Sequence, residues 1–119
     1  MHAENTRLHV VAEAGVTVVE LADRKILDEI NITQIGEQLN SLVAQSRKPK
    51  MLLDFTSVAH MSSSALGMLI TLHKRVREKH GELKLCGIQP AIYEVFVITR
   101  LNEIFHISPS RQEAISSFK

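Results

Sequence analysis

The segment that decides the fold is residues 52–67, which read LLDFTSVAHMSSSALG and change from a strand pattern to a helix pattern. The first part belongs to the apolar run Lys50–Phe55, which is typical of a strand covered on both faces in a parallel sheet. After the loop Thr56–Ser62, apolar residues recur at the spacing of one helix face, at Ala65, Leu69, Leu72 and Val76. We therefore predict a central strand, a loop, and a helix that begins at the serines and ends near Gly81.

A hairpin is predicted upstream of this unit. Arg7–Ala12 and Val16–Leu21 are rich in apolar and β-branched residues, and Ala14-Gly15 between them supplies a turn. The following segment, Ala22–Leu27, either extends the second strand or leaves it as a loop.

Asp28 or Asn31 then caps a helix that ends near Arg47, before Pro49. Its apolar positions follow helical spacing at Ile32, Ile35, Leu39, Leu42 and Val43. The pattern downstream predicts a strand at Leu83–Ile88, a helix at Pro90–Thr99, a short strand at Ile104–Ile107 and a last helix from Pro109.

Strands that alternate with helices after an opening hairpin predict an α/β fold with a mixed β-sheet, parallel in the middle and joined by right-handed crossovers. About four helices cover this sheet. The length of 119 residues and a hydrophobic content of 45% fit one domain, residues 1–119, because two cores would each lack apolar surface.

The composition excludes several classes of function. The chain has fourteen Lys and Arg residues and thirteen Asp and Glu residues. Its net charge of +1 provides no electrostatic field that would attract nucleic acid or an anionic membrane. The single cysteine, Cys86, lies in an apolar strand and indicates a buried, reduced thiol. Neither a signal peptide nor a membrane span is predicted. We expect a cytoplasmic protein without a cofactor, monomeric or weakly dimeric.

Residues 52–67 resemble the signature of the STAS domain family, and within it the bacterial anti-sigma factor antagonists. In that family a buried strand ends in Asp, a short loop returns to an apolar residue, and Asp-Ser-Ser-Gly-Leu-Gly opens a helix. Ser62–Gly67 takes the place of this hexapeptide, so that Ser62 replaces the family's Asp and Ala65 its first Gly. The resemblance extends from the hairpin to Leu101–Phe105 and implies the STAS fold.

The resemblance also implies regulation by partner exchange. An unphosphorylated antagonist binds an anti-sigma factor that is a serine kinase and frees a sigma factor, whereas phosphorylation of the first serine of the pair releases the antagonist. That serine corresponds to Ser63, with Ser62 and Ser64 as alternative acceptors, and a phosphoserine phosphatase would reverse the step. An acidic residue that lies near the acceptor in the family corresponds to Asp28. In this role the chain is not an enzyme.

The residues support such a switch on physical grounds. A phosphoserine at a helix start lies beside unpaired backbone N–H groups and the positive end of the helix dipole, so the fold tolerates it. Within a contact surface, its charge of about −1.5 to −2 repels a close partner. The predicted partner-binding residues are Asp28, His60, Met61, Ser62, Ser63, Ser64, Leu66, Gly67 and Ile70.

Other interpretations of these residues remain open. The serines also fit a simple N-cap, and the chain also fits a STAS scaffold or signalling subunit without serine phosphorylation. His60 near Ser63 suggests a serine-dependent hydrolase, although no Gly-x-Ser-x-Gly elbow surrounds any of the serines. His73 and His80 are too far apart along a helix to bind one metal ion without further ligands. Asp54 is predicted to anchor the loop by accepting backbone hydrogen bonds.

Overall fold

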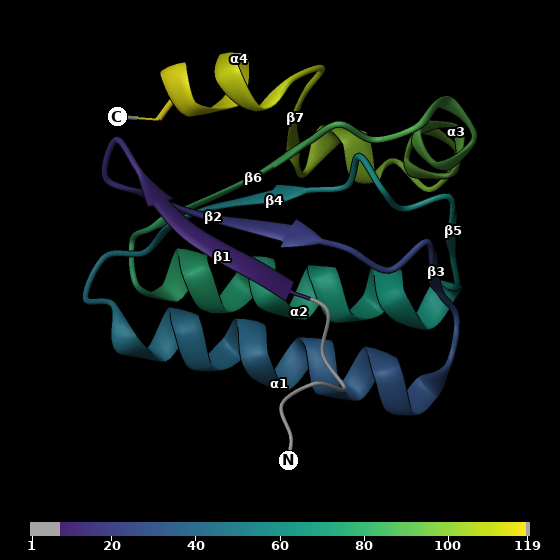
Figure 1. Cartoon of the computed structure of the whole chain (residues 1–119), viewed down its shortest axis with the longest axis horizontal. Helices are drawn as coiled ribbons and strands as arrows, with labels where there is room; N and C mark the ends of the chain where they lie inside the picture. The colour runs from purple at the N-terminus through teal and green to yellow at the C-terminus, as the bar shows by residue number, and fades with distance from the viewer. Residues whose placement is uncertain (1–7, 119) are drawn as a thin grey trace.

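A computed structural model describes residues 8–118, which form one layered α/β structure (Figure 1). In chain order the elements are β1 (Leu8–Glu13), β2 (Val16–Leu21), β3 (Lys25–Ile26), α1 (Glu29–Gln45), β4 (Lys50–Asp54), β5 (His60–Met61), α2 (Ser63–Glu78), β6 (Glu82–Cys86), α3 (Pro90–Ile98), the 3-10 helix η2 (Leu101–Glu103), β7 (His106–Ser108) and α4 (Arg111–Ser116).

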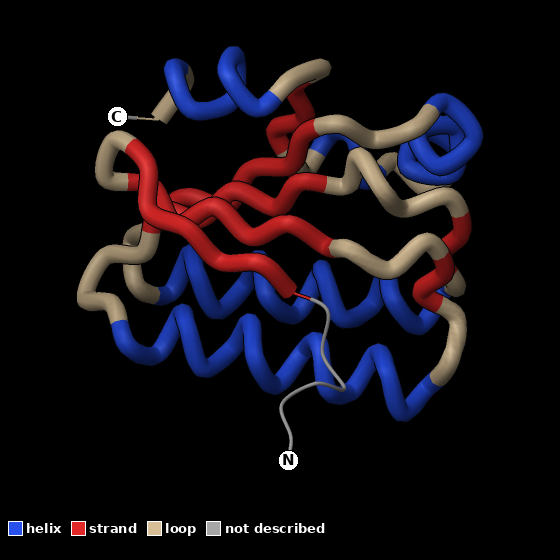
Figure 2. The backbone as a smooth tube through the Cα atoms, in the orientation of Figure 1, coloured by secondary structure: helices blue, strands red, loops and turns tan. Residues whose placement is uncertain are grey.

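The main sheet has the strand order β1-β2-β4-β6-β7 (Figure 2). β1 runs antiparallel to β2, whereas β2, β4, β6 and β7 are mutually parallel. The predicted fold is therefore confirmed: an opening hairpin is followed by parallel strands with helical crossovers, and four α-helices are present among the described residues.

The helices cover the sheet unequally. α1 and α2 lie side by side against one face, α4 lies over the other face, and α3 lies near β5 at one end of the molecule (Figure 1). The larger core fills the space between the sheet and the α1–α2 layer and continues under α3. It contains the central strand residues Met51 and Leu53 and the α2 stripe predicted from the sequence, Ala65, Leu69, Leu72 and Val76.

Local signals explain why the elements begin and end where they do. The hairpin turn uses positive φ angles at both Ala14 (54°) and Gly15 (80°), as a two-residue type I′ turn requires. Asp28 caps α1, because its carboxylate accepts hydrogen bonds from the backbone N–H groups of Ile30 (2.7 Å) and Asn31 (3.3 Å). Of the two predicted caps for α1, the structure thus selects Asp28.

The structure differs from the sequence prediction in a second, two-stranded sheet. β3 and β5 pair in parallel, with Lys25 opposite His60 and Ile26 opposite Met61. Ala59 and His60 also donate backbone hydrogen bonds to the carbonyl oxygen of Arg24. Strands of two residues have no periodic pattern, so the sequence left Ala22–Leu27 open between a strand extension and a loop, and predicted only a loop at Thr56–Ser62.

Two boundaries near the C-terminus also differ. The N–H groups of Ile104 and Phe105 donate to the carbonyl oxygen of Leu101 in η2, so the last strand begins at His106 instead of Ile104. Ser110 caps α4 by accepting from the N–H of Glu113, which places Pro109 before the helix instead of within it.

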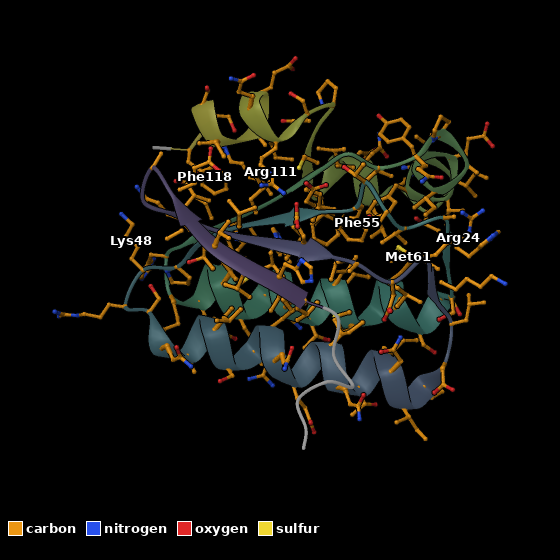
Figure 3. The ribbon with its side chains drawn as sticks, viewed as in Figure 1. Arg24, Lys48, Phe55, Met61, Arg111 and Phe118 are labelled. Carbon is orange, nitrogen blue, oxygen red and sulfur yellow. The ribbon has the colours of Figure 1, made fainter. Side chains whose placement is uncertain are left out.

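α4 closes a smaller apolar cluster on the second face of the sheet. Ala114 lies in this cluster with Val16, Val18, Leu52 and Cys86. The ammonium of Lys84 on β6 donates to the carbonyl oxygen of Ser117 (2.8 Å) and lies 4.8 Å from the ring centroid of Phe118. Figure 3 shows Arg111 reaching from α4 toward the sheet as a further attachment.

The thiol of Cys86 is expected to be unreactive in the native protein. Cys86 is fully buried, and burial raises the pKa of its thiol to about 12, with the negative charge of Asp54 acting in the same direction. At pH 8 the thiolate fraction is then about a thousandfold below that of a free cysteine. Titration with Ellman's reagent should release no nitrothiobenzoate until guanidinium unfolds the chain. Rapid reaction of the folded protein would contradict this placement.

Candidate functional site

The predicted serine cluster lies at the start of α2, where the β3–β5 pair holds it. Ser62 is the N-cap residue, and its hydroxyl oxygen accepts a hydrogen bond from the N–H of Ala65 at 3.3 Å. The backbone N–H of Ser62 donates to the carbonyl oxygen of Ile26 in β3 at 3.1 Å. The small sheet therefore fixes the position and direction in which α2 begins.

The three serine hydroxyls have different environments. Ser62 is half-buried and its oxygen caps the helix, whereas Ser63 and Ser64 are exposed. The hydroxyl of Ser64 donates to Oε2 of Glu29 at 2.6 Å, which links the first turns of α1 and α2. Among residues 8–118, the side chain of Ser63 makes no hydrogen bond. Ser63 is therefore the exposed serine whose hydroxyl is available to a reagent from outside.

Glu29 brings a carboxylate to the start of α2. It occupies the first turn of α1, beside its N-cap Asp28, and contacts Ser64. The family signature has a carboxylate at the position of Ser62, whereas here the carboxylate that contacts the serine cluster comes from a different helix. The sequence did not single out Glu29, because it is 35 residues distant from Ser64 along the chain.

Asp54 lies on the side of the sheet that faces α4. Its carboxylate accepts hydrogen bonds from the N–H (3.0 Å) and hydroxyl (2.6 Å) of Thr56, and from Nη2 of Arg111 at 2.9 Å. Arg111 also contacts the carboxylate of Glu20. Burial alone would raise the pKa of Asp54, but the hydrogen bonds from Thr56 and Arg111 outweigh it and hold that pKa below its usual value. These contacts are those of a structural anchor at the start of the loop.

The other predicted contact residues differ in exposure. His60 is exposed on β5, Met61 and Ile70 are half-buried, and Gly67 is exposed on α2 with open space beside it. Leu66 is only 8% exposed and belongs to the main core, so its side chain is not available as a contact. Helical spacing placed Leu66 on the flank of the buried stripe, and the core is wider than that stripe.

Several exposed apolar side chains at the same end of the molecule were not predicted. Ile30, in the first turn of α1, is 70% exposed and lines a shallow pocket with Glu29, Thr33 and Gln34. On α3 only Ile92 and Phe96 are buried, whereas Ile98 is 80% exposed. α3 is almost wholly apolar, yet four of its large side chains are exposed: Tyr93, Val95, Val97 and Ile98.

These features share one end of the structure. The first turns of α1 and α2, the β3–β5 pair and α3 all lie at the right of Figure 1. The side-chain amide of Gln89, the residue before α3, donates to the carbonyl oxygen of Thr56 at 3.1 Å, which ties α3 to the loop that leads to the serines. An exposed serine thus lies at the end of the molecule that also carries exposed apolar and acidic groups.

The histidines that suggested catalysis or metal binding can be placed in the structure. Within residues 8–118, no hydrogen bond joins His60 to a serine. Nor do the described residues contain a group of three His, Cys, Asp or Glu side chains able to hold a metal ion. His73 instead packs edge-on against the ring of Phe105, with 5.2 Å between ring centroids.

Comparison with known proteins identifies the family. The model of the STAS domain matches residues 8–114. The chain belongs to the STAS domain family. None of the helices within residues 8–118 has the length and hydropathy needed to cross a bilayer.

Relatives of this STAS chain include anti-sigma factor antagonists. It is 30% identical to the putative anti-sigma factor antagonist BtrV of Bordetella bronchiseptica, over 79% of this chain and 80% of that protein. It is 21% identical to the anti-sigma F factor antagonist of Paenibacillus polymyxa, over 97% of both chains.

Solved STAS structures agree with the fold. An anti-sigma factor antagonist (STAS) domain protein from Planctomyces limnophilus superposes with a TM-score of 0.81 and 26% identity, over 92% of this chain and 96% of that one. The phosphorylated form of the Bacillus cell fate determinant SpoIIAA gives a TM-score of 0.68 at 17% identity, over 92% and 97% of the two chains. At that identity, the second likeness concerns the fold alone.

Proposed function

We propose that this STAS domain is an anti-sigma factor antagonist that binds an anti-sigma factor with serine kinase activity and is released by phosphorylation of Ser63. The observation that carries this proposal is the environment of Ser63, which is exposed in the first turn of α2 with no hydrogen bond to its hydroxyl among the described residues. The names of its relatives support the antagonist role.

The neighbouring serines are poorer acceptors for structural reasons. Ser62 is half-buried, and its hydroxyl oxygen is already held by the N–H of Ala65 as the cap of α2, so it is less accessible to a kinase than the exposed Ser63. Phosphorylation of Ser64 would place a dianion against Glu29, whose carboxylate now accepts the hydrogen bond of that hydroxyl. Modification of Ser63 disturbs neither contact.

The fold is expected to tolerate a phosphate on Ser63, whereas a docked partner is not. The first turn of α2 has free backbone N–H groups and the positive end of the helix dipole, which favour an anion. A partner that covers Ser63 would have to desolvate the phosphate's charge of about −1.5 to −2. A penalty of about 3 kcal/mol corresponds to a loss of affinity of roughly a hundredfold.

The proposed docking surface combines polar groups around Ser63 with the exposed apolar side chains at the same end of the molecule. Leu66 is left out because it is buried. The proposed members are Asp28, Ile30, His60, Met61, Ser62, Ser63, Ser64, Gly67 and Ile70, with the exposed face of α3 as a neighbouring contact. In this role the chain supplies no catalytic group, and a phosphatase acting on phosphorylated Ser63 would restore binding.

The experiment incubates the protein with candidate anti-sigma factor kinases and ATP, and maps the phosphate by mass spectrometry. We expect phosphate on Ser63 and none in Ser63→Ala. Calorimetry should show that Ser63→Asp binds the kinase about a hundredfold more weakly than wild type. Ser110→Asp is the matched control, because it adds the same charge at the start of α4, where aspartate still caps the helix. Phosphate on another residue, or unchanged affinity of Ser63→Asp, would refute the switch.

A scaffold or signalling role without phosphorylation is the second candidate. It is favoured by Ser62, which stands where the family signature has an aspartate directly before the acceptor. In that case the chain would bind its partner with the same affinity before and after incubation with kinase and ATP. Ser62→Asp separates the two roles, since a restored signature should raise the phosphorylation rate of Ser63 only if a kinase recognises this site.

A further inference from the structure

Within residues 8–118, the outer edge of β1 is an unpaired sheet edge. β1 pairs with β2 along its full length, from Leu8 opposite Leu21 to Glu13 opposite Val16, and no other strand within residues 8–118 pairs with it. Natural sheet edges are usually shortened, bulged or guarded by proline or lysine. The six residues of β1, LHVVAE, contain neither proline nor lysine, and their register with β2 is continuous.

The hairpin turn determines which backbone groups of β1 point outward. In a two-residue hairpin, the residues that flank the turn, here Glu13 and Val16, exchange hydrogen bonds. Alternation along an antiparallel ladder then directs the N–H and C=O groups of His9 and Val11 toward β2. The corresponding groups of Leu8, Val10 and Ala12 face away from the sheet and are available to another strand.

The side chains of β1 divide between the two faces of the sheet. Leu8 packs on the main core, which places Leu8, Val10 and Ala12 on the α1–α2 side. His9 lies 3.7 Å from Glu20 across the ladder, which places His9, Val11 and Glu13 on the α4 side. Val10 and Val11 are 46% and 47% exposed, so the strand carries partly exposed apolar surface on both faces.

We propose that β1 is a homodimerisation strand that pairs antiparallel with β1 of a second copy of this chain, with Val11 on the two-fold axis. Val10 and Ala12 then exchange backbone hydrogen bonds with Ala12 and Val10 of the other copy, as their outward groups require. Val11 lies opposite Val11 of the other copy. Two five-stranded sheets thereby join into one continuous sheet.

Side-chain complementarity selects both the register and the occupant. With Val11 on the axis, His9 of each copy lies opposite Glu13 of the other, which gives two pairs of an imidazole donor and a carboxylate acceptor on the α4 side. The alternative register with Val10 on the axis satisfies the same backbone groups but places His9 opposite Val11. A strand whose two ends complement each other in this way favours a second copy over an unrelated strand.

The dimer is expected to be weak, because a contact between two six-residue strands is smaller than a standard protein interface of about 1,200–2,000 Å². It shares no residue with the proposed docking surface around Ser63. Failure of one proposal therefore leaves the other standing, and Ser63→Asp should dimerise as wild type does.

Cysteine trapping tests the register. In Val11→Cys the two introduced thiols lie across a non-hydrogen-bonded pair, where Cα atoms are about 4.5 Å apart, within the range of a disulfide. Mild oxidation with diamide should convert Val11→Cys into a covalent dimer several times faster than Val10→Cys, the matched control on the same strand with similar exposure. Wild type, whose Cys86 is buried, shows how much covalent dimer forms without an introduced cysteine. The proposed pairing would be overturned if Val10→Cys were trapped faster than Val11→Cys, or if neither variant formed a covalent dimer.

Sedimentation equilibrium of the full chain tests the association itself. Wild type should show a reversible monomer–dimer equilibrium as concentration rises. His9→Glu and Glu13→Lys should each raise the dissociation constant at least about fivefold, because the first places two carboxylates in opposition and the second removes the carboxylate that faces His9. The double variant should recover much of the lost affinity, because it restores an opposite-charge pair. A wild-type protein that stays monomeric at millimolar concentration, or a double variant weaker than both single variants, would overturn the proposal.

Discussion

Gly87→Ala is expected to lower the free energy of unfolding by about 3 kcal/mol or more. Gly87 follows β6 with a φ of +69°, a conformation that costs an alanine about 1–2 kcal/mol. A Cβ atom at this position would lie 2.4 Å from the hydroxyl oxygen of Thr56 and 3.0 Å from Oδ1 of Asp54. The added methyl group therefore breaks the hydrogen bond between these side chains, which leaves a mostly buried carboxylate without one of its donors at a further cost of about 1–3 kcal/mol.

Gly67→Ala is the matched control for this prediction. Gly67 lies within α2, and a Cβ atom built there has no neighbour within 4 Å. Alanine is a better helix former than glycine, so this variant should gain about 0.5–1 kcal/mol. Urea unfolding followed by circular dichroism measures both changes. Equal stabilities of the two variants would show that the close approach of Gly87 to the Asp54–Thr56 turn does not constrain the fold.

A double variant separates the two causes of the stability loss in Gly87→Ala, the unfavourable φ angle and the contact with Thr56. In a Thr56→Ala background the closest contact of the added methyl group is absent, whereas the unfavourable φ angle persists. The loss caused by Gly87→Ala should therefore be smaller in this background than in wild type, by about the energy of one side-chain hydrogen bond. Full additivity of the two substitutions would assign the whole effect to the backbone angle.

The elements that local chemistry determines could be predicted from the sequence. The apolar run before Asp54, the helical stripe from Ala65 to Val76 and the Ala14-Gly15 turn each depend on residues close together in the chain, and the structure has the strand, helix and hairpin in those places. The position of the serines at the start of α2 follows from the same local pattern. For this reason the fold class and the location of the candidate site both agree with the sequence.

What the sequence could not indicate depends on contacts between distant residues. Arg111 reaches Asp54 across 57 positions, and Glu29 reaches Ser64 across 35, so no local pattern connects them. The partial exposure of α3 also depends on tertiary structure. The sequence predicts the helix, but only its placement in the fold determines that Ile98 faces outward.

Phe55→Ala is expected to lower the free energy of unfolding by about 3–5 kcal/mol, the usual range for removing a buried phenylalanine ring. Phe55 directly follows β4 and is fully buried, among the side chains between the end of this strand and α3 (Figure 3). Its N–H donates to the carbonyl oxygen of Cys86 at 2.9 Å, and its own carbonyl oxygen accepts from Val58, so the ring and the backbone together hold the first turn of the loop.

Two control variants, Phe55→Leu and Phe118→Ala, accompany Phe55→Ala. Together they show whether the loss of stability comes from the packing of this ring beneath the loop or from the removal of any aromatic ring. Phe55→Leu keeps most of the buried volume and should cost less than half as much as the alanine variant. Phe118 follows α4 and is half-buried against the smaller apolar cluster, and its removal should cost less because the site opens to water and leaves no closed cavity. Calorimetric scans should show the largest decrease in melting temperature, about 10 °C or more, for Phe55→Ala. A decrease no larger than that of Phe118→Ala would mean that the loop leading to Ser63 is held by its backbone hydrogen bonds and not by the ring.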